Sequence, residues 1–103
     1  MGDILFEVTS KLDKKIRTTK DYWSFIISLK HLEMEGKEKD VKRALTDPDF
    51  IRISHDDPNV VLYYRRYGKH FICAVVRHLN EDGFLITTYI TDKVKEGEQI
   101  WKR

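Results

Sequence analysis

The stretch NVVLYYRRYGKHFICAVVRHLNEDGFLITTYIT, from Asn59 to Thr91, decides the fold of this 103-residue chain. It contains three runs rich in β-branched and aromatic residues, at 60–66, 70–78 and 84–90. Short polar gaps with turn-forming residues separate these runs. This composition and spacing are typical of consecutive antiparallel strands joined by tight turns. The stretch therefore predicts a three-stranded meander.

The same stretch has a one-sided charge distribution. Between Pro58 and Asn80 there is no carboxylate side chain, whereas basic side chains recur. The basic and aromatic residues of the meander are Arg65, Arg66, Lys69, His70, Arg77, His78, Tyr63, Tyr64, Tyr67 and Tyr89. Cations and hydroxyls at strand ends are suited to holding a phosphate ester. An ordinary solvated sheet face also carries arginine and lysine, so the pattern alone leaves both interpretations open.

A first helix is predicted upstream of the meander. Thr18 or Thr19 can cap it, and apolar residues from Tyr22 onward recur at helical spacing until about residues 32–35. His31 falls at the edge of this apolar stripe, where one ring nitrogen can face a cleft. A histidine at such a position suits either a proton donor or a simple stabiliser of the helix C-terminus.

Further elements follow from the same kinds of pattern. Alternation over residues 3–9 indicates a strand, and the cationic segment 11–20 is interpreted as a strand edge or a loop. Its charges suit either protection of a strand edge or contact with an RNA backbone. A second helix is predicted over residues 37–46, with Val41, Ala44 and Leu45 as its apolar seam, and a short strand is predicted over 50–54. Residues 91–98 are expected to begin as a helical turn, after which Trp101 docks on the core.

These elements predict one domain of the α+β class over residues 1–103. The expected architecture is two helices packed on one face of a four- to five-stranded antiparallel sheet. A chain of this length is too short for two domains with separate cores.

Composition narrows the function classes. No apolar run approaches the roughly 20 residues that span a bilayer, and the N-terminus lacks a secretory signal, so a cytoplasmic protein without membrane contact is expected. The single cysteine, Cys73, excludes an internal disulfide and fits a reducing compartment. Glycine-rich phosphate loops and paired metal-ligand cysteines are absent, and His55-Asp56-Asp57 is a poor metal cluster because neighbours on a tight turn diverge. We therefore expect neither a cofactor nor a metal.

The remaining histidine, arginine, threonine and tyrosine side chains suit one reaction that needs no metal. Cleavage of RNA through its own 2′-hydroxyl needs a base, an acid and cations that stabilise the charged phosphorane. Alternation places Thr88 on the more apolar side of the last strand of the meander, opposite Thr87 and Tyr89. A β-bulge would invert this assignment.

The order of predicted elements resembles the superfamily of barnase, EndoU, colicin and RelE-like nucleases, and more narrowly its small prokaryotic and phage-associated members. The resemblance covers about residues 22–101, and its motifs are loose. The residues that carry it are Trp23, Ile27, Lys30-His31, Val41, Leu45, Asp47-Pro48-Asp49, Ile53-Ser54, Tyr63-Tyr64-Arg65, Val75-Val76 and Ile86-Thr87-Thr88-Tyr89. Leu32 departs from the proline that often follows the helix-end histidine in such proteins.

The resemblance implies a toxin-like endoribonuclease with a RelE- or barnase-like fold. It implies that His31, Arg65, Thr88 and Tyr89 are the catalytic residues. The expected substrate-binding residues are Arg66, Tyr64, Lys69 and Arg77. RNA, free or ribosome-bound, and an acidic antitoxin protein are the implied partners. A non-catalytic RNA-binding or protein-interaction module on the same fold is the alternative.

Overall fold

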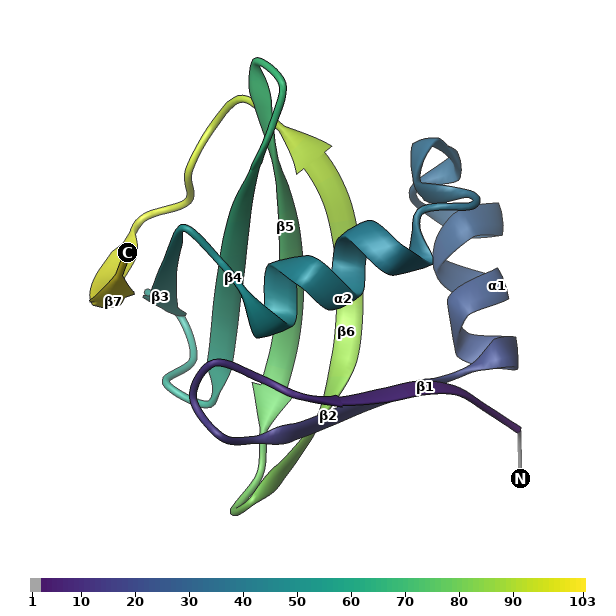
Figure 1. Cartoon of the computed structure of the whole chain (residues 1–103), viewed down its shortest axis with the longest axis horizontal. Helices are drawn as coiled ribbons and strands as arrows, with labels where there is room; N and C mark the ends of the chain where they lie inside the picture. Colours follow the sequence, from purple (N-terminus) through teal and green to yellow (C-terminus); the bar gives the residue numbers. More distant parts are fainter. Residues whose placement is uncertain (1–2) are drawn as a thin grey trace.

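The computed structural model of the chain describes residues 3–103, which form one seven-stranded sheet with two short α-helices (Figure 1). Strands account for 49% and helices for 22% of it, so the protein is dominated by β-structure. The elements are β1 (Ile4–Thr9), β2 (Lys15–Thr19), α1 (Lys20–Leu29), a 3-10 turn η1 (Leu32–Met34), α2 (Glu38–Thr46), β3 (Phe50–Ser54), β4 (Val60–Tyr67), β5 (His70–His78), β6 (Asp82–Thr91) and β7 (Gly97–Lys102).

The sheet corrects the predicted architecture. Its strand order is β1-β2-β6-β5-β4-β3-β7, and β2 pairs with β6 in parallel while all other pairs are antiparallel. The expected RelE- or barnase-like arrangement of two N-terminal helices on a four- to five-stranded antiparallel sheet is therefore wrong. The meander β4–β5–β6 is confirmed, but a β1–β2 hairpin precedes the helices and adds two strands to its edge.

The parallel β2–β6 pair depends on a glycine that the sequence analysis assigned to a turn. Ile16 is fully buried and lies opposite Gly83, which is already the second residue of β6. A Cβ atom at Gly83 would lie 2.7 Å from the carbonyl oxygen of Arg77 and 2.8 Å from Cδ1 of Ile16. Only glycine lets the two strands approach closely here. The segment 11–20, interpreted as a strand edge or a loop, contains the strand β2, whose buried residues are Ile16 and Thr18.

The C-terminal segment also differs from its prediction. Instead of a helical turn over residues 91–98, the chain crosses the sheet and forms β7 against the outer edge of β3. Gly97 begins that strand, and a Cβ atom there would collide with the carbonyl oxygen of Ile53. Trp101 lies opposite Ile51 and packs on the core as predicted.

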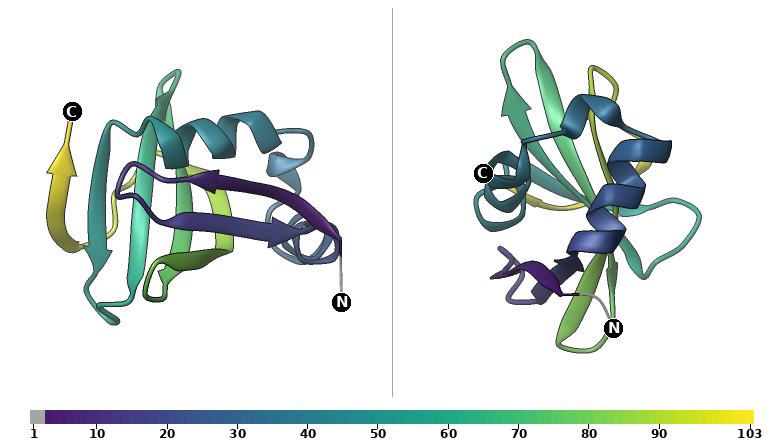
Figure 2. Two further views of the ribbon diagram at one scale, coloured as in Figure 1. Left: turned by 60° about the horizontal axis from the view of Figure 1, so that its bottom comes forward. Right: turned by 90° about the vertical axis from the view of Figure 1, so that its right-hand side faces the viewer.

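Both helices contribute to the larger of two hydrophobic clusters. α2 lies across β4 and β5 with the β1–β2 hairpin beside it (Figures 1 and 2), and its predicted seam of Val41, Ala44 and Leu45 is fully buried. The N–H of Lys11 in the β1–β2 turn donates to the carbonyl oxygen of Leu45. The sheet therefore curls so that its first strands contact α2 from the side.

The opposite face of the sheet carries a second cluster around Leu62, Tyr64, Cys73 and Val75. The crossover between β6 and β7 covers part of it, because Val94 packs there and the N–H of Lys95 donates to the Tyr64 hydroxyl. This face is only partly covered, whereas the face under the helices is closed.

Candidate nucleic-acid interface

The structure brings His31 and Tyr89 together. α1 is capped by Thr19 as predicted but ends at Leu29, so His31 lies beyond it, with its N–H donating to the carbonyl oxygen of Ile26. The rings of His31 and Tyr89 meet edge to face, with 5.4 Å between centroids. Nδ1 of His31 lies 3.3 Å from the carboxylate of Glu33. His31 therefore sits against the edge of β6 and remains partly exposed.

Thr88 is inaccessible to a substrate. Its side chain is fully buried, and its hydroxyl donates to the carbonyl oxygen of Cys73 at 2.8 Å. A β-bulge in β6 lies before Thr88, because Val76 lies opposite Leu85 while Val75 lies opposite Thr87. Thr88 therefore keeps its predicted side and faces the helices together with Ala74. The bulge instead turns Ile86 to the opposite cluster with Tyr89.

Arg65 is used to hold the end of α2. Its guanidinium donates to the carbonyl oxygen of Asp47 at 2.6 Å and to the Asp47 carboxylate at 3.1 Å. Asp47 is the C-cap residue of α2, where a cation is favourable because of the helix dipole. Arg103 binds the same carboxylate, and the two arginines, Arg103 foremost, keep the pKa of Asp47 below its usual range.

Three of the four implied catalytic residues, His31, Arg65 and Thr88, do not lie at one point. Arg65 lies opposite Ile72, which lies opposite Ile90, so two strand spacings, or roughly 10 Å, separate its backbone from β6. His31 lies at β6, and the side chain of Thr88, in β6, is fully buried. A single phosphate cannot contact all three side chains in this arrangement.

Two of the expected substrate-binding residues also have structural roles. Tyr64 is fully buried and stacks on Phe50, with 4.8 Å between ring centroids; burial, with a smaller contribution from Cys73, raises its pKa to about 12. Arg77 forms an ion pair of 3.0 Å with Asp57 in the β3–β4 loop. Burial likewise raises the pKa of Tyr89 and that of the Cys73 thiol, the latter to about 12, so neither group ionises readily.

The other two expected substrate-binding residues, Arg66 and Lys69, lie together on an exposed hairpin. Residues Arg66 to His70, which we call the cationic hairpin, are all exposed and form the connection between β4 and β5 that protrudes in Figure 1. Gly68 makes the turn possible with a φ of 61°. Neither Arg66 nor Lys69 forms an ion pair within residues 3–103.

Aromatic rings accompany the cations of this hairpin. The guanidinium of Arg66 lies 5.2 Å from the ring centroid of Phe71, and Nζ of Lys37 lies 6.0 Å from that of Tyr67. Tyr67 is 38% exposed, so the rest of the protein covers its ring only in part. The cationic hairpin thus presents an accessible aromatic ring between positive charges.

The acidic side chain of Asp49 contacts the backbone of this hairpin and not its basic side chains. The carboxylate of Asp49 accepts the backbone N–H of Arg66 at 2.6 Å, and its other oxygen binds Arg103 at 3.2 Å. The side chains of Arg66 and Lys69 therefore keep their charges available at the hairpin tip.

Sequence reasoning did not identify Lys37 as part of this surface, since it precedes α2 and is distant in the chain. No sequence signal marks this contact, which arises from the way α2 crosses β4 and β5. Within residues 3–103 no three His, Cys, Asp or Glu side chains are grouped so as to hold a metal ion.

Comparison with known proteins yields no relative: no family model, curated protein or solved structure matches the chain. Over the described part of the chain, every helix is too short or too polar to cross a membrane.

Proposed function

We propose that the protein binds single-stranded RNA through the cationic hairpin, without cleaving it. The observation that carries the proposal is the exposed Tyr67 ring on a protruding turn, flanked by Arg66 and Lys69 of that turn and by Lys37 at the start of α2. Exposed aromatic rings stack on unpaired bases, and neighbouring cations contact the phosphates.

Several features favour RNA as the nucleic acid. Sequence-independent affinity comes mainly from Lys and Arg contacts to phosphates, and the cationic hairpin supplies such groups from two sides. The Tyr67 hydroxyl and the His70 imidazole add hydrogen-bonding groups that can reach a 2′-hydroxyl. A stacking surface requires splayed bases, so a single strand fits this turn better than a duplex.

A binding role is preferred over cleavage because the groups for acid–base chemistry are dispersed. Cleavage requires a proton acceptor and a proton donor within hydrogen-bond reach of one phosphate. Arg65 pairs with Asp47, and the hydroxyl of Thr88 is bound to a buried carbonyl. Of the four implied catalytic residues, His31 and Tyr89 are the pair that remains close, at the edge of β6.

The test is fluorescence anisotropy with a labelled single-stranded RNA of about 12 nucleotides, a length within the usual site size of such modules. Arg66→Gln with Lys69→Gln should weaken binding about tenfold or more and flatten the salt dependence, since about two phosphate contacts are lost. Lys15→Gln with Lys20→Gln is the matched control, because both lysines are exposed at the other end of the sheet. That double variant should bind within about twofold of the wild type.

A second pair of variants isolates stacking from charge. Tyr67→Leu should weaken binding about tenfold, whereas Tyr67→Phe, which keeps the ring, should bind almost as well as the wild type. Equal losses in the hairpin and control double variants would contradict the proposal. Cleavage of the RNA in the presence of EDTA, abolished by His31→Ala, would favour the nuclease hypothesis instead.

A further inference from the structure

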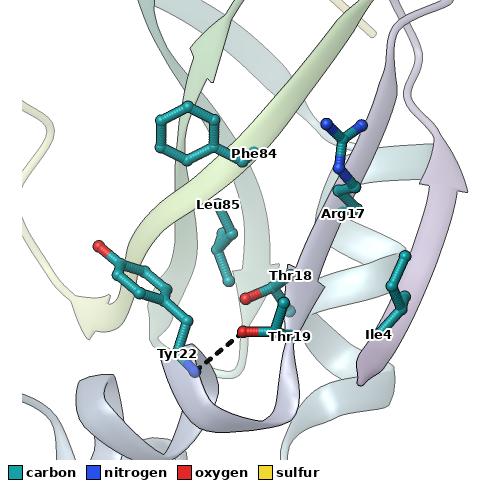
Figure 3. Close-up of a pocket in the computed structure, with 7 residues that line it drawn as sticks. All are labelled: Ile4, Arg17, Thr18, Thr19, Tyr22, Phe84 and Leu85. Atoms are coloured by element: carbon teal, nitrogen blue, oxygen red, sulfur yellow. Dashed lines mark hydrogen bonds between the residues drawn. The ribbon is translucent and has the colours of Figure 1, made fainter. Parts of the chain in front are cut away.

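A pocket opens where β2 leaves the sheet, at the opposite end of β6 from the cationic hairpin. Parallel pairing of β2 with β6 ends at Arg17 and Phe84, after which β2 turns into α1 and β6 forms its bulge. The pocket has a volume of about 440 Å³. Its lining residues are Ile4, Arg17, Thr18, Thr19, Tyr22, Phe84 and Leu85 (Figure 3).

The pocket contains a buried polar group without a partner. Thr18 is 4% exposed, and its hydroxyl makes no hydrogen bond. Figure 3 shows this hydroxyl directed toward Leu85, on the side of the pocket where Tyr22 lies. The neighbouring hydroxyl of Thr19, by contrast, accepts the N–H of Tyr22 at 3.1 Å as the cap of α1. Buried hydroxyls are nearly always satisfied, so the unpaired hydroxyl of Thr18, in the wall of the pocket beside Leu85, is a candidate partner for a polar group of a ligand.

The apolar wall of the pocket is unusually exposed. Ile4 is 51% and Phe84 39% exposed, although both line the pocket and could pack on a molecule within it. The Tyr22 hydroxyl donates to the carbonyl oxygen of Ile86 at 2.8 Å, which holds the tyrosine ring at the pocket wall. A ligand body that fits this wall is therefore apolar.

The rim of the pocket carries one weakly engaged cation. Nη1 of Arg17 lies 3.7 Å from the carboxylate of Asp82, longer than a charge-assisted hydrogen bond, and both side chains are nearly half exposed. An exposed pair of this length contributes little, so an anionic ligand can compete with Asp82 for the guanidinium.

We propose that this pocket binds an amphipathic carboxylate: an apolar chain or ring with one carboxylate and one further hydrogen-bonding group. Arg17 binds the carboxylate at the rim, Phe84 and Ile4 cover the apolar body, and the Thr18 hydroxyl pairs with the second polar group. The volume lies within the range of small-molecule sites, which are mostly apolar with a few placed polar groups. The site is independent of the RNA proposal because it lies at the other end of the meander.

The experiment is an NMR titration of the ¹⁵N-labelled protein with octanoate, 3-hydroxyoctanoate and octan-1-ol. Binding in the pocket should shift the amide signals of Thr18, Thr19, Tyr22 and Leu85. Octanoate should bind about tenfold more tightly than octan-1-ol, and 3-hydroxyoctanoate more tightly than octanoate.

Three variants test the assigned roles. Arg17→Gln should remove the preference for octanoate over octan-1-ol, and Asp82→Asn should strengthen octanoate binding because it removes the competing carboxylate. Thr18→Val should remove only the preference for the 3-hydroxy group and should raise the melting temperature of the free protein. Lys102→Gln, on β7, is the charge-matched control and should change none of these preferences.

The proposal has clear ways to fail. Equal affinities for octanoate and octan-1-ol in the wild type, or amide shifts scattered outside the pocket, would overturn it. So would the absence of any shift up to the solubility limit of the three probes. Loss of the charge preference in Lys102→Gln as well as Arg17→Gln would show a non-specific charge effect and not a site.

Discussion

The two ends of the β4–β5–β6 meander contain a glycine each and use it in opposite ways. At Gly68, between β4 and β5, the backbone has positive φ, and no heavy atom lies within 4 Å of the position of a Cβ. At Gly83, in β6, the φ is ordinary, but a Cβ would collide with the carbonyl oxygen of Arg77 in β5 and with the Ile16 side chain of β2. One end is free of packing and available to a partner, whereas the other is closed by the β1–β2 hairpin.

The two ends of the meander therefore serve different purposes: residues at the free end are available for binding, and residues at the closed end stabilise the fold. Residues at the free end can change without disturbing the core, because few atoms contact them. Residues at the closed end hold together strands that are distant in sequence. Variants at the free end should therefore change RNA affinity, whereas variants at the closed end should change the free energy of unfolding.

The largest effect is expected for Gly83→Ala. The added methyl group must displace both the carbonyl oxygen of Arg77 and the side chain of Ile16, which costs about 3 kcal/mol of unfolding free energy. Gly68→Ala is the matched variant and should cost only about 1 kcal/mol, since its penalty is confined to the positive φ. Urea denaturation of both variants measures the two costs, and equal values would show that β2 does not pack on Gly83 as described.

A pH dependence should arise near the closed end as well. Burial, with a smaller contribution from Lys14, lowers the pKa of His78 from 6.5 to about 4. Between these values the unfolded chain binds a proton that the folded protein does not, so stability is complete above pH 6.5 and falls as the pH drops toward 4.

Because His78 is only partly buried, we expect this loss to be about 2 kcal/mol, below the full value of the shift. Melting temperatures between pH 7 and pH 4 measure it. His78→Gln should flatten the profile over this interval, and an unchanged profile in that variant would assign the dependence to other groups.

A smaller effect is expected for Tyr63→Phe. The buried Tyr63 hydroxyl donates to Oγ of Ser10 at 2.9 Å and lies 2.9 Å from Nε2 of His78, so it joins the β1–β2 turn to the end of β5. Removal of this hydroxyl should lower the free energy of unfolding, measured by urea denaturation, by about 1 kcal/mol. RNA affinity should stay unchanged, because the Tyr63 hydroxyl contacts Ser10 and His78 and not the cationic hairpin.

The smallest change in stability, and the sharpest contrast in function, is expected for two adjacent arginines. Arg65→Gln releases the carboxylate and carbonyl of Asp47 and should lower the melting temperature slightly while RNA affinity stays within about twofold of the wild type. Arg66→Gln should leave the melting temperature unchanged and weaken RNA binding about threefold to fivefold. Anisotropy and thermal melting of the two variants would contradict the comparison if both properties changed together.

Much of the local structure could be predicted from the sequence. The meander, α2 with its Val41, Ala44 and Leu45 seam, and the Thr19 cap of α1 follow from periodicity and capping, which act over a few residues. The candidate surface was predicted in part, since Arg66 and Lys69 belong to a segment without carboxylates.

Long-range contacts decided the rest. Ile16 pairs with Gly83, and β7 pairs with β3, although these segments are distant in the sequence. No local pattern indicates which distant segments meet, because the fold as a whole decides which loops close. The bulge at Ile86 likewise depends on how β6 pairs with β5. The roles of Arg65 and Arg66 differ because Asp47, at the end of α2, reaches one and not the other. Local patterning thus accounts for the strands and helices of this chain, whereas its sheet order, its pocket and the choice of free cations depend on which distant segments meet.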